Sequence, residues 1–170
     1  VLVSPENAPS KALDICWKFG SGPVIISNDQ RLVDTGITPL LQKEMGAALW
    51  DPEKGDENIH IAEKAKTGVV FAEYGLTESG GIVLFSAPER GRSVSLLPEA
   101  SLFVLRKSTI LPRVAQLAQK LHDMAQEGQR MPSCINLIGG PSSTADIELI
   151  KVVGVHGPVH ATYLIIDDCA

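Results

Sequence analysis

Short apolar segments alternate with amphipathic segments along most of this chain, and that alternation restricts the folds it can adopt. Apolar runs of strand length occur at residues 23–27, 47–50, 81–86, 101–106, 134–140 and 161–167. Segments with the periodicity of amphipathic helices fall at residues 10–19, 37–46, 56–68, 109–128 and 144–152. Strands that alternate with helices favour an α/β fold, with a mainly parallel sheet flanked by helices.

Residues that start and stop helices flank several of these segments. Ser10 and Thr109 are expected to cap the helices at 10–19 and 109–128, and Pro112 suits a first helical turn. We expect Gly128 to end the helix at 109–128, and we expect the helix at 56–68 to end at a glycine as well.

The composition is that of an ordinary globular protein. The chain has 170 residues, and we expect residues 1–170 to form a single domain. No apolar run is long enough to span a bilayer, and the first ten residues lack the basic and apolar parts of a signal peptide. The net charge of −5 disfavours nucleic acid as a partner, because nucleic acid attracts basic patches. We therefore expect a cytoplasmic protein without a membrane span.

The cysteines bear on redox chemistry. Cys16, Cys134 and Cys169 lie far apart and form no C-x-x-C pair, which is typical of reduced cytoplasmic thiols. Iron–sulfur clusters and structural zinc sites use clustered cysteines. We therefore expect no metal and no cofactor on this chain, and we expect a flavin or iron–sulfur partner if the chain takes part in electron transfer.

A polar segment, GGPSSTADIE at residues 139–148, follows a strand-like run. Ligands of open α/β sheets bind outside the carboxyl ends of the strands, so we expect a pocket here. Glycines allow the backbone to turn sharply, and hydroxyls with the free amides of a following helix can bind an anion or a carbonyl oxygen. The residues expected to bind the ligand are Gly140, Ser142, Ser143 and Thr144.

Asp146 in this segment has two interpretations. A carboxylate would repel an anion, so Asp146 is better suited to accept hydrogen bonds from ligand hydroxyls or to orient a histidine. Ser143 and Asp146 also have the spacing of a capping box, which needs no ligand. Both interpretations stay open from the sequence.

His156 lies in the segment GVHGP, between glycines at 154 and 157. A histidine on such a loop is a candidate general acid, general base or hydrogen-bond donor near neutral pH. Alternatively, its ring ties down the loop by bonding a carbonyl. We expect His156 and Gly157 to belong to the same pocket as residues 140–144.

Two further charged residues are candidates. Glu78 precedes a pair of glycines and a strand, where it can face a cleft or lie in a solvated turn. Arg92 can bind a carboxylate or phosphate with two parallel hydrogen bonds, although an exposed loop arginine is the common outcome.

Four segments together resemble the lactate-utilisation protein C family (LutC, also called YkgG), which is built on the LUD domain. They are AEYGLTESGGIVL, GRSVSLLP, GGPSSTADIE and GVHGPV, in order between residues 68 and 168. The resemblance implies a fold like that of the sugar-phosphate isomerase, CoA-transferase and formyltetrahydrofolate cyclo-ligase group. It also implies that the family's N-terminal helical segment is absent from this chain.

The resemblance implies a function and a site. The function is the oxidation of L-lactate to pyruvate, alongside two iron–sulfur partner proteins that carry the clusters. The family's loops correspond to residues 140–146, 156–158 and 78–80, with Ser79 where threonine is more usual. We therefore expect His156, Asp146 and Glu78 as catalytic residues, and Arg92 among those that bind the ligand.

Two other functions fit the same residues. The chain can be an independent enzyme of this fold group that acts on a sugar phosphate, an acyl-CoA or a folate. It can also be a non-catalytic assembly module with a degenerate pocket. The residues alone support an α/β protein with a polar pocket that binds a small carboxylate or phosphorylated ligand.

Overall fold

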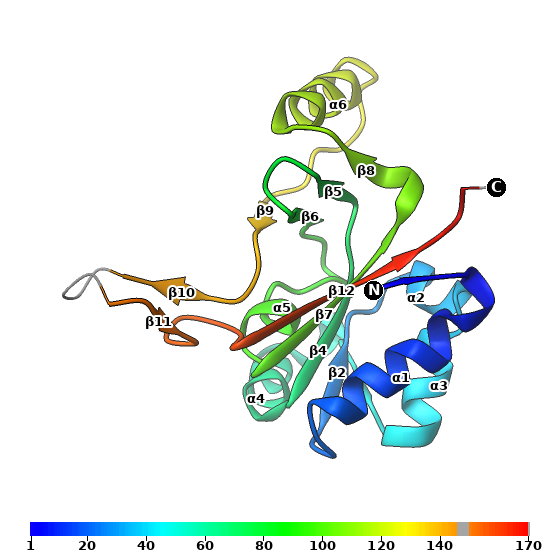
Figure 1. The fold of residues 1–170 in the computed structure, drawn as a ribbon, viewed down its shortest axis with the longest axis vertical. Coiled ribbons are helices and arrows are strands. Elements are labelled where there is room, and N and C mark those ends of the chain that lie inside the picture. The colour runs from blue at the N-terminus through cyan, green and yellow to red at the C-terminus, as the bar shows by residue number, and fades with distance from the viewer. Residues whose placement is uncertain (146–149, 170) are drawn as a thin grey trace.

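The computed structural model describes residues 1–145 and 150–169, and its centre is a sheet of six parallel strands in the order β1-β12-β7-β4-β2-β3 (Figure 1). These strands are β1 (Leu2–Val3), β2 (Val24–Ile26), β3 (Ala48–Leu49), β4 (Thr67–Phe71), β7 (Ala100–Arg106) and β12 (His160–Ile166). The predicted α/β arrangement with a mainly parallel sheet is therefore confirmed. The strands at 67–71 and 74–76 were not expected from the sequence.

Helices cover both faces of the central sheet, as Figure 1 shows. One face carries α1 (Ala8–Lys18), α2 (Gln30–Asp34) and α3 (Ile37–Met45), and the other carries α4 (Asp56–Lys64) and α5 (Ser93–Leu96). Successive residues of a strand point to opposite faces, so Ile26 packs with the first group and Ile25 with the second. Burial on both faces explains why these strands are almost uniformly apolar.

A second sheet has the strand order β8-β5-β6-β9 and follows the carboxyl ends of β4 and β7. Its strands are β5 (Tyr74–Leu76), β6 (Gly81–Phe85), β8 (Ile110–Leu111) and β9 (Ile135–Ile138). The pairs β5–β6 and β6–β9 are antiparallel. Helix α6 (Val114–Gln126) packs on this sheet through Leu117, which contacts the buried cluster of Leu76 and Val83.

A two-stranded antiparallel ribbon, β10 (Ser143–Thr144) with β11 (Val152–Val153), projects from the sheets. Single-turn 3₁₀ helices lie at η1 (Pro5–Asn7), η2 (Pro52–Lys54) and η3 (Lys107–Thr109). Within the described residues, no helix has the length and apolar character needed to cross a membrane.

The helix expected at 144–152 is wrong in its described part. Ser143 and Thr144 pair with Val153 and Val152, and residues 150–151 are not helical. Three of these four side chains are β-branched, which favours an extended backbone. The free helical amides invoked for ligand binding are therefore absent from residues 143–145 and 150–153.

The ends of three other predicted helices also differ. The helix expected at 109–128 begins only at Val114, because Leu111 precedes a proline and pairs with β5 as part of β8. The helix expected at 56–68 ends at Lys64, and Gly68 lies inside β4. Ser10 lies within α1 rather than at its cap, since the helix begins at Ala8.

Candidate functional site

A hollow of about 340 Å³ lies between the loop after β9 and the loop before β12. It brings together five of the residues that the sequence predicted to share a pocket, together with Pro141 and Pro158. The five are Gly140, Ser142, Ser143, His156 and Gly157. The two polar loops, more than ten residues apart in the chain, therefore converge on one space.

Backbone hydrogen bonds hold these loops together. The Ser142 amide donates to the Pro158 carbonyl at 2.9 Å, and the Gly154 amide donates to the Ser142 carbonyl at 2.9 Å. The Gly140 amide donates to the Tyr163 hydroxyl of β12 at 2.7 Å. Gly140 has φ +78°, a left-handed conformation that suits glycine. Ser142 and Ser143, which follow this turn, line the hollow, and the loop stays tied to the central sheet through Tyr163.

The hollow does not lie where the sequence predicted. Strand β9 belongs to the second sheet and runs antiparallel to β6, so the loop after it is not at the carboxyl edge of the parallel sheet. The hollow instead lies beside the amino-terminal end of β12, where Ala161 lines it. The prediction assumed a single sheet, whereas the chain forms two.

Other expected site residues lie elsewhere. Thr144 follows Ser143 in β10 but does not line the hollow, and Asp146 is outside the described residues. Arg92 is exposed at the start of α5 and lines a separate, smaller cavity. The exposed Glu78 caps α6, because its carboxylate accepts a hydrogen bond of 2.5 Å from the Val114 amide.

Four charged side chains form a cluster at the carboxyl edge of the parallel sheet. Asp29 follows β2, Glu73 follows β4, and Arg31 and Arg90 bridge them. Arg31 binds Asp29 through two parallel hydrogen bonds of 2.9 and 2.6 Å, and its guanidinium donates to Glu73 at 2.8 Å. Arg90 donates to the same Glu73 oxygen. The cluster is formally neutral and links three segments of the chain.

Burial and pairing act in opposite directions on this cluster. The side chains of Asp29 and Glu73 are only 5% and 11% exposed, whereas those of Arg31 and Arg90 are each 30% exposed. Burial by itself would raise the pKa of Asp29, but the hydrogen bonds and positive charge of Arg31 outweigh it and hold that pKa below its usual value. Burial likewise tends to lower the pKa of Arg31, but Asp29 and Glu73 raise it overall.

This cluster was not predicted from the sequence, because its members are spread over residues 29–90. One signal was present: Ser27 ends the run at 23–27 and Asp29 comes two residues later, where ligand-binding residues of parallel sheets collect. The Ser27 hydroxyl is buried and has no hydrogen-bond partner among the described residues. It lines the small cavity next to Arg90.

Within residues 1–145 and 150–169, no group of three or more histidine, cysteine, aspartate or glutamate residues is arranged to hold a metal ion. The hollow beside His156 offers a ligand hydroxyls, an imidazole and backbone amides, and the charged cluster contains guanidinium groups and carboxylates.

The chain belongs to the LUD domain family, whose pattern matches residues 1–166. This confirms the resemblance that the four polar and glycine-rich segments indicated. The chain is 69% identical to the uncharacterized protein YkgG of Escherichia coli K12 over 168 residues, covering 99% of this chain and 73% of that protein.

Two other relatives carry the name lactate utilization protein C. That of Macrococcus caseolyticus is 44% identical, over 99% of this chain and 71% of that protein. That of Bacillus subtilis is 47% identical, over 89% of this chain and 65% of that protein. A crystal structure of a DUF162 family protein from Deinococcus radiodurans has the same fold, with a TM-score of 0.63 at 20% identity over 98% of this chain and 86% of that one.

Proposed function

We propose that this chain is a subunit of an L-lactate utilisation system, which binds a small carboxylate while iron–sulfur partner proteins accept the electrons from lactate. The observation that carries this proposal is the 44–47% identity to proteins named lactate utilization protein C. The LUD domain match, which runs from residue 1 to residue 166, supports it across the fold. The cytoplasm is the compartment that we propose, in keeping with the three unclustered cysteines.

The hollow beside His156 is the site that we propose for the carboxylate. Ser142 and Ser143 supply hydroxyl donors, and a protonated His156 supplies both a donor and a positive charge. A neutral His156 can instead accept the proton of a 2-hydroxy acid. Asp146 is proposed as the residue that orients this imidazole. Glu78 and Arg92 lie outside the hollow, so the proposed ligand contacts are those of Ser142, Ser143 and His156.

Binding to the purified chain tests the site directly. L-lactate and pyruvate should raise the melting temperature of the chain, because a ligand that binds only the native state stabilises it. The neutral analogue lactamide should not, because it lacks the negative charge that the site is proposed to bind. His156→Ala and Ser142→Ala should each weaken binding about tenfold, which corresponds to about 1.4 kcal/mol for a charge-assisted hydrogen bond. His122→Ala is the matched control, since His122 is exposed on α6. Equal affinity for lactamide would contradict the proposed site.

Growth on L-lactate tests the role in the cell. A strain without its own copy of the gene should grow on L-lactate when it carries the wild-type chain or His122→Ala, and poorly when it carries His156→Ala. The tagged chain should co-purify with iron–sulfur proteins from lactate-grown cells. Full growth without the gene would contradict the proposal, and turnover of a sugar phosphate, acyl-CoA or folate by the chain alone would favour an independent enzyme.

A further inference from the structure

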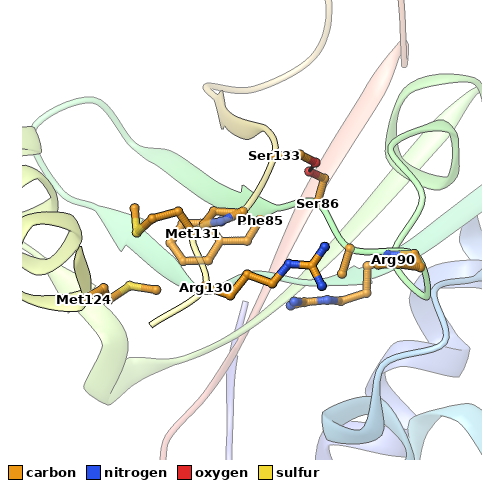
Figure 2. Close-up of a pocket in the computed structure, with 10 residues that line it drawn as sticks. Phe85, Ser86, Arg90, Met124, Arg130, Met131 and Ser133 are labelled. Carbon is orange, nitrogen blue, oxygen red and sulfur yellow. Dashed lines mark hydrogen bonds between the residues drawn. The ribbon is translucent and has the colours of Figure 1, made fainter. Parts of the chain in front are cut away.

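A further cavity, of about 580 Å³, lies between the loop after β6 and the loop that joins α6 to β9 (Figure 2). It shares no lining residue with the hollow beside His156. Its position is the carboxyl edge of the parallel sheet, because Arg90 both lines it and binds the Asp29–Glu73 cluster. Ligands of parallel α/β sheets bind at this edge.

Two guanidinium groups enter this cavity from opposite loops. Figure 2 shows the side chains of Arg90 and Arg130 extending toward the same space. Arg90 is neutralised by Glu73, but Arg130 forms no ion pair and no hydrogen bond with any residue that the structure describes. The neutral four-residue cluster plus Arg130 therefore leaves one uncompensated positive charge at the cavity. Like charges that converge in this way attract an anion.

The rest of the wall is largely apolar. Phe85, Met124 and Met131 line the cavity, and Figure 2 shows them together, away from the guanidinium groups of Arg90 and Arg130. Methionine side chains adapt to irregular apolar ligands. Ser86 and Ser133 share a hydrogen bond of 3.1 Å at the rim. The combination of a few polar groups with apolar walls is typical of sites for organic molecules.

A buried hydroxyl without a hydrogen-bond partner among the described residues lies in a small cavity next to this one. Ser27 is 1% exposed, and its hydroxyl has no hydrogen-bond partner among the described residues. It faces a small cavity that shares Phe85, Ser86 and Arg90 with the large one. A buried hydroxyl without a partner is destabilising, so a polar group of a ligand or a water molecule is expected beside it.

We propose that this cavity binds an organic anion, with its carboxylate or phosphate between Arg90 and Arg130 and its apolar body against Phe85, Met124 and Met131. The planar guanidinium forks suit both anionic groups. A cavity of about 580 Å³ can hold a molecule much larger than a three-carbon acid. The ligand is therefore distinct from the carboxylate proposed for the His156 hollow.

Calorimetric titration of the purified chain tests this proposal, with octanoate, octyl phosphate, neutral octanamide and acetate as probes. At least one octyl anion should bind about tenfold more tightly than octanamide, which lacks the charge, and than acetate, which lacks the apolar body. The difference between octanoate and octyl phosphate identifies the preferred anionic group. No binding of either octyl anion at millimolar concentration overturns the proposal, and so does equal binding of octanamide.

Substitutions locate the bound probe. Arg130→Gln should weaken binding of the preferred octyl anion about tenfold, and it should not affect folding because Arg130 is exposed and unpaired among the described residues. Arg113→Gln removes the same charge at the other end of α6 and should leave affinity unchanged. His156→Ala should also leave it unchanged. Loss of octyl-anion binding in His156→Ala but not in Arg130→Gln would place the ligand in the other hollow and overturn the proposal.

Discussion

Asp29 is a nearly buried carboxylate whose charge is matched by two arginines, and its loss should be costly. In Asp29→Asn, Arg31 loses its paired carboxylate, and Arg31 and Arg90 share only Glu73. We expect the free energy of unfolding at pH 7 to fall by about 2–3 kcal/mol, below the cost of breaking a fully buried pair, because water reaches both guanidinium groups. Urea unfolding measures this, with the exposed Asp14→Asn as control. A loss equal to that of the control would contradict it.

The stability difference between wild type and Asp29→Asn should depend on pH. The pKa of Asp29 is lowered in the folded state, so the ionised group stabilises the fold above the unfolded value of about 3.9 and this contribution is lost as pH falls through the lower folded value. The difference in unfolding free energy between wild type and Asp29→Asn should therefore be constant from about pH 5 to 7 and shrink as pH falls below about 4. A difference that is unchanged at pH 3 would show that Asp29 does not titrate as this environment requires.

Cys16 provides a second prediction for a single residue. Burial raises the pKa of its thiol to about 12, so almost no reactive thiolate forms in the native protein at pH 8. Iodoacetamide should therefore alkylate the exposed Cys169 within minutes and leave Cys16 unmodified until urea is added. Peptide mass spectrometry distinguishes the two sites. Equal rates of modification would mean that α1 opens from the sheet frequently.

Packing of one element on another depends on a single glycine in β4. A Cβ atom added at Gly68 would lie 1.8 Å from the Val94 carbonyl oxygen of α5, so the helix must shift outward. We expect Gly68→Ala to destabilise the fold by about 3 kcal/mol, as overpacking of a close contact does. Gly139→Ala is the matched control, because a Cβ there meets nothing within 4 Å. Thermal unfolding of both variants tests the difference.

The start of α6 depends on a residue from another element. Glu78, in the turn between β5 and β6, accepts a hydrogen bond from the Val114 amide at the helix start. Glu78→Ala should lower the free energy of unfolding by about 1 kcal/mol, the typical value of a helix cap. Glu89→Ala is the control, because Glu89 is exposed and, among the described residues, forms a hydrogen bond only through its carbonyl. A stable variant that fails to support growth on L-lactate would instead assign Glu78 to the chemistry.

At the scale of the whole molecule, local sequence patterns predicted the sheet and the helices that flank it, but not the division of the strands between two sheets. The apolar runs at 23–27, 81–86, 101–106 and 161–167 all contain strands, because burial on both faces selects uniformly apolar residues. Periodicity does not tell which sheet a strand joins. The run at 134–140 was therefore assigned to the parallel sheet, whereas β9 pairs antiparallel with β6.

The hollow beside His156 could be predicted from the sequence, whereas the charged cluster and the cavity at Arg130 could not. The two polar loops were recognisable because their glycines, hydroxyls and histidine lie close together in the chain, and the structure brings them into one hollow. The cluster of Asp29, Arg31, Glu73 and Arg90 was not, because its parts come from three segments that only the tertiary fold joins. Arg130 likewise reaches its cavity from a loop without a recognisable motif.

The position of β12 between β1 and β7 has a consequence for the order of assembly. Strand β12 follows every other described strand of its sheet in the chain, yet it occupies an interior place, and it pairs with β1 over a separation of more than 160 residues. While the ribosome is still making residues 160–166, the apolar edge of β7 has no partner, and non-local parallel pairing of this kind is slow. We therefore expect the nascent chain to expose this edge of β7 until β12 has been translated.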